Sequence, residues 1–404
     1  MTRLVSLLVG SVVMVALVLW AASEYLGAPP SAGGSAEPAA AGASTPQDLV
    51  EPAIIAAERV QLHVETVLGD LDTVWDMIWA PDGSMWFSER AGRISRFDLA
   101  ERTRTVVGEI PNVLESGEAG LMGVALHPDF PNTPMVYAVH SYDTGRGIGN
   151  RLVRMRFEDG SLSSPEALFN GWAGRRNHDG SRIVFGPDGF LYITMGDAGN
   201  RPVSQDLSSL NGKILRLTAE GEPAPGNPFG DHIWSFGHRN PQGLVFHPNG
   251  MLYSAEHGQR DEDELNLIEP GRNYGWPTLE GFCSTPQEEA YCAENDVVEP
   301  LHAWSPTVGI GGAEVYVGDA IEGWDGDLLA VSLRGEALYH IGLSEDGRKA
   351  VSIETILEGE YGRLRDVLVG PDGEVYIATS NRDGRGNPTA NDDRILRLTA
   401  PVGR

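Results

Sequence analysis

Short apolar strands and tight turns alternate along most of the chain from about residue 54 onward. One unit recurs: a turn of the Pro-Asp-Gly type, followed by a short strand of apolar or alternating residues. Pro presets φ and Asp-Gly supplies the reversal, so each unit predicts a hairpin of a small sheet. The six copies of the turn begin at Ala80, His127, Gly186, His247, Gly323 and Gly370.

The copies are spaced by roughly 45 to 80 residues, as expected for a propeller with insertions between its blades. The sequence therefore predicts an all-β fold, a six-bladed β-propeller with four-stranded antiparallel blades. We expect the last strand, residues 394–398, to close the ring by pairing with a strand from the N-terminal end of the folded region. Helical apolar periodicity is scarce in this region, which disfavours a helical solenoid.

The N-terminal residues have the form of an export signal, in which Arg3 precedes an uncharged apolar stretch from Leu4 to Ala22. About 19 residues of this kind also suffice to span a bilayer if they are not cleaved. We expect a signal peptide or N-terminal membrane anchor over 1–26, a flexible Ala/Gly/Pro/Ser linker over 27–53 and the propeller domain over 54–400. The protein is then exported, to the periplasm or another extracytoplasmic space.

The charge and the cysteine count exclude several classes of function. The formal net charge is -27 and no Lys/Arg-rich run offsets it, so nucleic acid is not an expected partner. Cys283 and Cys292 lie in a Gly/Pro/Glu-rich segment that we expect to be irregular. Their spacing excludes a CxxC site but permits a short-loop disulfide in an oxidising compartment. Residues 145–149 lack the spacing of a dinucleotide-binding motif, and no G-x-S-x-G elbow occurs, which disfavours nicotinamide and nucleophilic-serine chemistry.

A histidine, His178, lies in the loop that precedes a predicted strand. A histidine in such a loop is usually a surface group. The strand that follows ends in Met195-Gly196-Asp197, however, and so delivers a carboxylate to the next loop. Asp197 is therefore able to orient the imidazole of His178 and hold it as a base.

Two further segments gather polar side chains. The turn that contains Arg239, Asn240 and Gln242 suits an oxygen-rich ligand, although such side chains also cap the backbone groups of turns. Carboxylates crowd the loop from Glu256 to Asn266, and hard oxygen donors of this kind suit calcium better than zinc. A solvated acidic loop is the alternative interpretation.

Two arginines, Arg363 and Arg365, lie on one face of the segment if it is extended. Such a pair binds carboxylates or phosphates well. It also pairs readily with surface acids in a chain this acidic, so the pattern alone leaves both interpretations open.

The same segments, in this order, resemble a known family. From about Val64 to Leu398 the chain is similar to the soluble PQQ-dependent glucose and aldose-sugar dehydrogenases, also called the glucose/sorbosone dehydrogenase family. Each motif is weak alone, but their number and order are specific. The matching stretches are residues 120–130, the His178 loop, 212–217, 237–243, 263–266, 273–277 and 363–367.

The resemblance implies a propeller that binds pyrroloquinoline quinone (PQQ) and calcium at one end of its channel. It implies that His178 is the general base for the hydroxyl of a sugar or alcohol, that Asp197 supports it and that Arg239 polarises a quinone oxygen. The implied cofactor contacts are Glu118, His178, Arg239, Asn240, Gln242, Gly258, Gln259, Arg334, Arg363 and Arg365. The implied calcium ligands are the backbone carbonyls of Gly258 and Gln259, with Glu264 and Tyr274 at a second site in some members.

Three positions depart from the glucose-oxidising members of the family. Gln259 replaces a proline, which a carbonyl ligand tolerates, and Arg334 replaces a lysine, which keeps a cation with a different reach. Glu118 stands in place of a glutamine, beside an anionic quinone. This carboxyl is expected to be protonated, to pair with an arginine, or to reflect a different substrate preference.

Two other functions compete with the dehydrogenase. The first is a propeller without cofactor that binds carbohydrate or protein, which has no need for the combination of His178, Asp197 and clustered arginines. The second is a calcium-dependent hydrolase of the lactonase type, which requires acidic or amide side chains converging on a metal in the channel. For the dehydrogenase, the expected partners are a sugar or alcohol substrate and an electron acceptor that the sequence does not identify.

Overall fold

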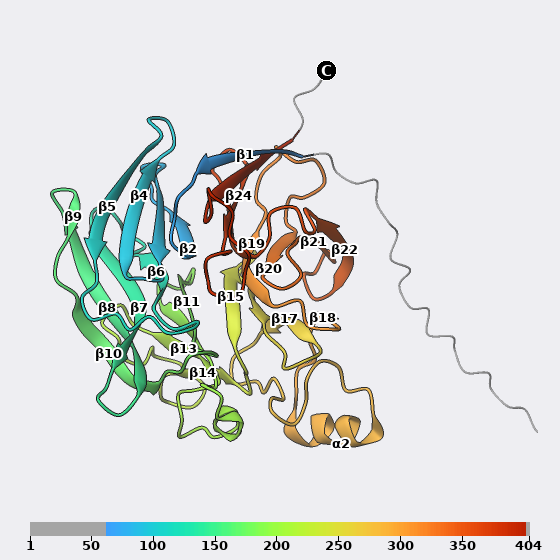
Figure 1. Cartoon of the computed structure of the whole chain (residues 1–404). Helices are drawn as coiled ribbons and strands as arrows, with labels where there is room; N and C mark the ends of the chain where they lie inside the picture. The colour runs from blue at the N-terminus through green and yellow to red at the C-terminus, as the bar shows by residue number, and fades with distance from the viewer. Residues whose placement is uncertain (1–61, 401–404) are drawn as a thin grey trace, which may run out of the picture. The chain divides into compact units, whose positions relative to one another are not determined.

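The computed structural model describes residues 62–400, which form six antiparallel sheets, the blades of a β-propeller (Figure 1). The first strand of each blade contacts the first strands of both neighbours, and this ring of contacts closes from β23 back to β2. These first strands therefore line the central axis. The predicted all-β, six-bladed fold with four-stranded antiparallel blades is confirmed, with one short extra strand in blade 2.

The blades follow one another along the chain. Blade 1 comprises β2 (Val74–Trp79), β3 (Met85–Glu89), β4 (Arg93–Asp98) and β5 (Thr103–Glu109). Blade 2 comprises β6 (Leu121–Leu126), β7 (Met135–Asp143), β8 (Ile148–Glu158), β10 (Glu166–Ala173) and the extra β9 (Ser161–Leu162). Blade 3 comprises β11 (Gly180–Phe185), β12 (Leu191–Met195), β13 (Lys213–Leu217) and β14 (Ile233–Phe236). Blade 4 comprises β15 (Pro241–Phe246), β16 (Leu252–Glu256), β17 (Asp263–Ile268) and β18 (His302–Trp304). Blade 5 comprises β19 (Ile310–Val315), β20 (Leu328–Ser332), β21 (Leu338–Leu343) and β22 (Ala350–Ile356). Blade 6 comprises β23 (Leu364–Val369), β24 (Val375–Thr379), β25 (Ile395–Thr399) and β1 (His63–Leu68).

The recurrent turn occupies the same place in every blade, between the first and the second strand. In blade 1 the backbone amide of Gly83 donates to the carbonyl of Ala80, and Asp82 accepts from the backbone amide of Ser84. Gly83 adopts a φ of 78°, a left-handed conformation that glycine reaches without strain. The repeat in the sequence therefore marks the hairpin that begins each blade.

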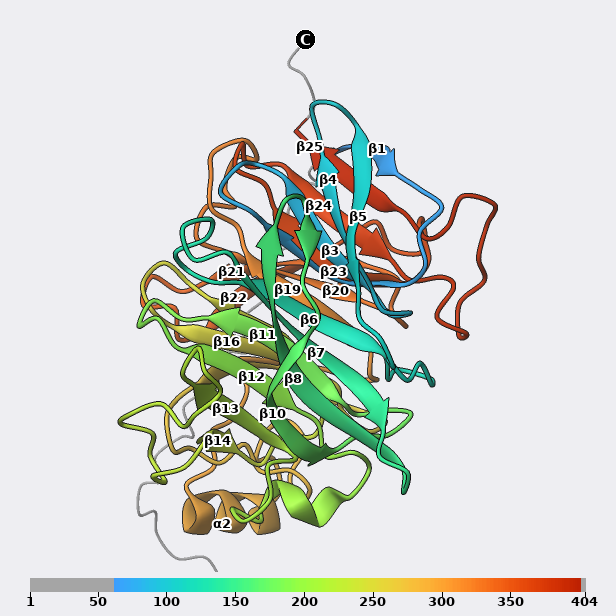
Figure 2. The same cartoon turned by 90° about the vertical axis from the view of Figure 1, so that its left-hand side faces the viewer.

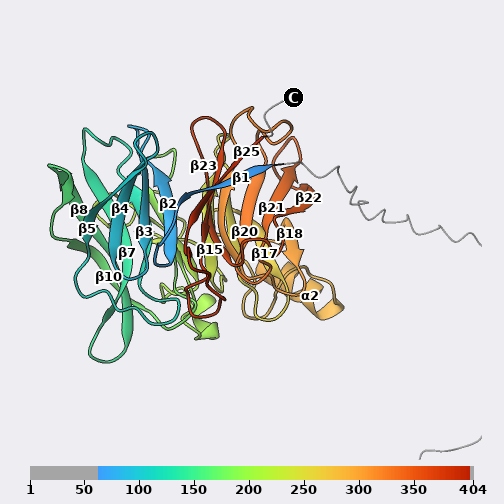
Figure 3. The ribbon, with the colours of Figure 1, turned by 45° about the horizontal axis from the view of Figure 1, so that its top comes forward.

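Blade 6 closes the ring, because its outer strand comes from the other end of the described chain. Strand β1 pairs antiparallel with β25, with Val64 opposite Leu398 and Thr66 opposite Leu396. Figure 3 shows β1 lying along β25. The predicted closure by a strand from the N-terminal end is confirmed.

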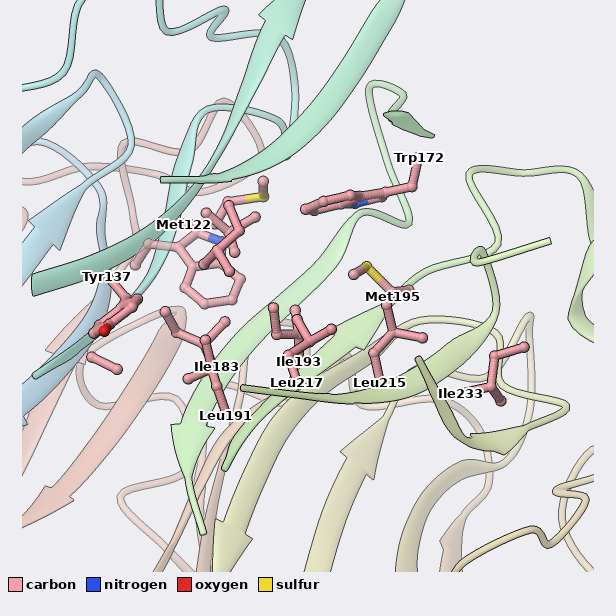
Figure 4. Packing of buried hydrophobic residues seen from close by; sticks show 14 residues of the cluster. Met122, Tyr137, Trp172, Ile183, Leu191, Ile193, Met195, Leu215, Leu217 and Ile233 are labelled. Carbon is pink, nitrogen blue, oxygen red and sulfur yellow. The ribbon is translucent and has the colours of Figure 1, made fainter. Parts of the chain in front are cut away.

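Apolar side chains fill the spaces between neighbouring blades. Blades 2 and 3, seen side by side in Figure 2, share a cluster in which Met122 and Tyr137 face Ile183, Ile193 and Leu215 (Figure 4). All five side chains are at most 3% exposed. Since each sheet buries both faces against its neighbours, no blade has a core of its own.

The central axis holds a buried ion-pair cluster. Arg182 of β11 pairs with Asp76 of β2 and, at 2.9 Å, with Asp366 of β23. Its Nε also donates to the backbone carbonyl of Gln242 in β15 at 3.0 Å. One guanidinium therefore connects the inner strands of four blades.

The segment around the two cysteines is more ordered than the sequence pattern indicated. We expected an irregular Gly/Pro/Glu-rich loop, but residues 286–295 form the helix α2 (Pro286–Asn295; Figure 1). Cys292 within this helix is disulfide-bonded to Cys283. Thr285 and Glu288 form a reciprocal capping box at the helix N-terminus. That Thr-Pro-Gln-Glu signal is present in the sequence, and our expectation of an irregular segment was wrong because it neglected it.

The predicted leader (1–26), the predicted linker (27–53) and the first residues of the predicted domain lie outside the described residues. Within residues 62–400, no helix has the length and apolar character needed to cross a membrane.

Truncation of a side chain at the ring closure tests how far the fold depends on it. Leu396 of β25 is fully buried among residues of β1, β23 and β24. We expect Leu396→Ala to lower the free energy of unfolding by about 2–5 kcal/mol in urea titrations, because it leaves a cavity at the closing strand. Val351→Ala, at a residue that is 56% exposed, is the control and should change stability by less than about 0.5 kcal/mol. Equal stability of both variants would show that the closure contributes little.

Candidate active site

A pocket of about 270 Å³ lies where the inner strands begin, because its lining residues directly precede β6, β11, β15, β19 and β23 or belong to neighbouring loops. The loops that carry them are far apart in the sequence, and the ring of blades brings them together. The predicted site residues that line it are Glu118, His178, Arg239, Gly258, Gln259, Arg334 and Arg363.

His178 and Asp197 form a hydrogen-bonded pair at this pocket. The imidazole Nδ1 lies 2.8 Å from the Asp197 carboxylate, and the His178 side chain is 16% exposed whereas that of Asp197 is fully buried. Asp197 also accepts from the amide of Gly199 and, at 2.9 Å, from the indole of Trp276. Burial alone raises the pKa of Asp197, but these hydrogen bonds outweigh it and hold the pKa below its usual value.

The pairing defines the chemistry available to the histidine. A carboxylate that stays ionised fixes Nδ1 as the donor nitrogen, which leaves the lone pair on Nε2. It also stabilises the imidazolium that forms when Nε2 takes a proton. The arrangement therefore leaves Nε2 of His178 able to take a proton, while Asp197 orients the ring.

The turn at Arg239 is held from beneath by a buried carboxylate. Glu256 accepts from the backbone amides of Arg239 and Asn240 and lies 2.9 Å from Nδ1 of His238. The Arg239 guanidinium donates to the carbonyl of His257 at 2.9 Å. Sequence reasoning missed Glu256, whose local signal was only a carboxylate at the start of the acidic run.

The two arginines near the end of the chain share one buried acid, Asp383. Arg363 donates to it through Nε and Nη2 at 2.8 and 2.7 Å, and Arg365 lies 3.6 Å away. Arg365 also donates to Gln242, which in turn contacts Asn240. Sequence reasoning anticipated pairing with surface acids and missed Asp383, because nothing local marks the buried acid of a loop that begins 15 residues further on.

Several buried nitrogen atoms around the pocket lack a hydrogen-bond partner among residues 62–400. Unpaired buried donors are costly, and they are rare unless a ligand or water completes them. The atoms concerned are Arg239 Nε, Asn240 Nδ2, His257 Nε2 and Arg365 Nε. The set calls for a ligand rich in acceptor oxygens, and His257, which lines the pocket, was not selected from the sequence as a side chain.

The loop expected to bind calcium presents its carbonyls freely. The backbone amide of Gly258 donates to Asp263 at 2.8 Å and that of Gln259 donates to Glu280. Among the described residues, the carbonyl oxygens of Gly258 and Gln259 accept no hydrogen bond. Two unengaged carbonyls on one short loop are suitable hard ligands.

The residues expected at a second calcium site do not line the pocket. Glu264 accepts from the amides of Gly281 and Asn266, and burial raises its pKa to about 8. The Tyr274 hydroxyl is engaged by the backbone of Leu267 and Glu269. Within the described part of the chain, no group of three or more His, Cys, Asp or Glu side chains is placed to hold a metal ion.

The unusual carboxyl at Glu118 is paired. One oxygen lies 2.9 Å from Arg385 Nη1, and the other accepts from the backbone amide of His178 at 3.1 Å. Burial raises the pKa of Glu118. Nearby cationic groups and this amide lower the pKa by a larger amount, so it lies below its usual value. Of the alternatives left open by the sequence, the structure shows pairing with an arginine, Arg385. Arg334 is exposed and donates to the Thr307 hydroxyl.

Comparison with known proteins identifies the family. The family model for glucose/sorbosone dehydrogenase matches residues 71–396. The chain belongs to this family. The PQQ-bound aldose sugar dehydrogenase of Streptomyces coelicolor is 38% identical with a TM-score of 0.75, over 85% of this chain and 99% of that one.

Two more relatives of the family support the assignment. A putative oxidoreductase (glucose dehydrogenase) of Thermus thermophilus is 44% identical with a TM-score of 0.74, over 84% of this chain and 100% of that one. Aldose sugar dehydrogenase YliI of Escherichia coli is 30% identical, over 81% of this chain and 92% of that one. The similarity therefore covers the whole propeller.

Beside the histidine, the protein carries a buried acid, Asp179. One of its oxygens accepts from Asn150 at 2.9 Å and from the amide of Arg175 at 2.8 Å. The other, Oδ2, has no partner among the described residues. Burial raises the pKa of Asp179 to about 7, so the folded protein retains a proton that the unfolded chain, with a pKa near 3.9, releases.

The raised pKa of Asp179 predicts that the free energy of unfolding depends on pH. Because the folded pKa is raised, the contribution of Asp179 to stability falls as pH rises from about 4 to about 7 and is constant outside that window. We expect Asp179→Asn to gain stability relative to wild type as pH rises, by a few kcal/mol at most. Urea titrations at pH 4.5 and pH 8 test this, and a difference between the two proteins that does not change with pH contradicts it.

Proposed function

We propose that the protein is a PQQ- and calcium-dependent dehydrogenase that oxidises the C1 hydroxyl of aldose sugars or the hydroxyl of a related alcohol. The observation that carries the proposal is the set of unpaired buried nitrogens beside the His178–Asp197 pair. Two of these nitrogens belong to Arg239 and His257, which line the pocket together with His178. A base beside such donors suits the removal of a proton next to a bound, oxygen-rich acceptor.

The donor set fits PQQ, a planar quinone with carboxylates. Arg363 and Arg334 line the pocket wall and would hold the carboxylates of the cofactor. Arg239 would bind a quinone oxygen and stabilise the charge that develops on it. Asn240, Gln242 and Arg365 form one hydrogen-bonded network and would support these contacts.

Calcium fits the loop that follows β16. The free carbonyls of Gly258 and Gln259 would bind the ion, and the carboxylates of Asp263 and Glu280 hold the amides of the same two residues. A second calcium at Glu264 and Tyr274 has weaker support, because both side chains are engaged by other protein groups.

His178 and the residues around it would each have a separate role in the reaction. Nε2 of His178 takes the proton of the substrate hydroxyl as the C–H bond breaks, and Asp197 stabilises the resulting imidazolium. Bound PQQ supplies the acceptor for the hydride. Trp276 and Gly199 keep Asp197 ionised by donating to its carboxylate.

The two competing functions are less well supported. A lactonase-type hydrolase needs acids converging on a channel metal, but Asp76 and Asp366 are paired with Arg182. A binding module without a cofactor would leave these buried nitrogens unpaired, and each unpaired nitrogen carries a desolvation cost. The Streptomyces relative, described as PQQ-bound, also favours the dehydrogenase.

Export and electron transfer complete the proposal. The predicted leader directs the chain out of the cytoplasm, either released or tethered to the membrane. The Cys283–Cys292 disulfide is consistent with an oxidising compartment. A separate acceptor would then take the electrons from the reduced quinone.

Reconstitution is the decisive experiment. The purified protein is mixed with PQQ and calcium, and dye reduction is followed with a panel of aldoses and simple alcohols. We expect reduction that depends on both additions, and a rise in thermal midpoint on binding. A protein that binds no quinone would instead be a binding module, and our proposal would be wrong.

Substitution of the base tests its role. We expect His178→Ala to lower kcat by about 10²- to 10⁴-fold while the affinity for PQQ, followed by fluorescence quenching, changes far less. His63→Ala, at an exposed histidine of β1, is the matched control and should retain full activity. Unchanged turnover in His178→Ala would remove His178 from the mechanism.

A further inference from the structure

The loop that carries His178 is braced by a second loop, which contains Gly117 and Glu118. The Glu118 backbone amide donates to the carbonyl of Arg176 at 2.8 Å, and the Glu118 carboxylate accepts from the backbone amide of His178 at 3.1 Å. The approach is close enough that a Cβ on Gly117 would lie 2.4 Å from the Arg176 oxygen. Two hydrogen bonds in opposite directions therefore connect Glu118 to the histidine loop.

This bracing acts on a backbone conformation that is unfavourable by itself. His178 has a φ of 63°, in the left-handed region that residues other than glycine rarely adopt. A carboxylate that accepts from its amide fixes the backbone, while Asp197 fixes the ring. His178 is thus held at two points by two different carboxylates.

The carboxylate of Glu118 is itself held by Arg385, on the loop between β24 and β25. Arg385 Nη1 lies 2.9 Å from Glu118, and the guanidinium side chain is 58% exposed. The backbone amide of Arg385 donates to Asp383 at 2.9 Å, the acid that holds Arg363 and Arg365. A single loop therefore contacts both the bracing carboxylate and the arginine pair.

We propose that Glu118, fixed by Arg385, is a positioning residue for His178, and that the β24–β25 loop couples the placement of the base to that of the two arginines. Arg385 neutralises Glu118, so a carboxylate can stand at this wall of the pocket without repelling an anionic ligand. The assignment of His178 as base rests on the proposed function, whereas the bracing of its backbone does not.

Amide exchange tests the bracing in the apo-protein, without any cofactor. Residue-resolved hydrogen–deuterium exchange at His178 is compared in wild type, Glu118→Gln, Glu118→Ala and Arg385→Gln. We expect Glu118→Ala to exchange at least about 10-fold faster, since the acceptor is lost. Glu118→Gln keeps an acceptor oxygen and should remain protected, and Arg385→Gln should fall between the two. Unchanged exchange in Glu118→Ala overturns the proposal.

Kinetics of the reconstituted enzyme test the consequence. We expect Arg385→Gln to lower kcat about 5- to 20-fold with KM within about 2-fold, because the uncompensated Glu118 carboxylate moves away from the His178 amide and the base is misplaced. The double variant Glu118→Gln/Arg385→Gln should recover most of that loss, since no uncompensated carboxylate remains. Arg146→Gln, at an exposed arginine of the β7–β8 loop, is the matched control and should behave as wild type.

The two experiments separate the two hypotheses. If wild type shows no quinone-dependent activity but Glu118→Ala accelerates exchange at His178, the proposed function is wrong and the bracing holds. If the enzyme is active and the Arg385→Gln loss is not relieved in the double variant, the coupling of Arg385 to Glu118 is wrong.

Discussion

The structure depends on a single buried guanidinium at the axis of the propeller. Arg182 is taken out of water and is compensated by Asp76, Asp366 and a backbone carbonyl from three other blades. Breaking one partner of such a cluster leaves an uncompensated charge, which is far more costly than the net gain from the intact pair. Any arrangement that separates these four inner strands is therefore costly.

The arrangement of the inner strands also positions the candidate active site. Its groups stand at the beginnings of the inner strands, two residues before β11 in the case of His178 and two before β15 in the case of Arg239. Carboxylates then hold both groups: Glu118 and Asp197 hold the backbone and the ring of His178. Glu256 accepts from the backbone amide of Arg239. Placement of the reactive groups is thus a property of the ring, and the local loops only adjust it.

Much of this could be predicted from the sequence because its signals are local. The Pro-Asp-Gly turns and the strands beside them are read within about ten residues, and they were sufficient for the blade number and the closure. The pairing of His178 with Asp197 was accessible because one short hairpin separates them. Asp383 and Arg385 could not be found in this way, since Arg385 meets Glu118 across 267 positions of sequence. The helix α2 was missed for a different reason, because its apolar face is weak and only its cap marks it.

The pairing of β1 with β25 also imposes a condition on how the molecule forms. The partners stand more than 300 residues apart, so this contact has the longest loop to close among the strand pairs of the described chain. Until β25 is available, β1 has no partner strand, and the apolar faces of blades 1 and 6 are incompletely covered. Synthesis from the N-terminus therefore produces an open arc of blades, which becomes resistant to aggregation and proteolysis only when its two ends meet.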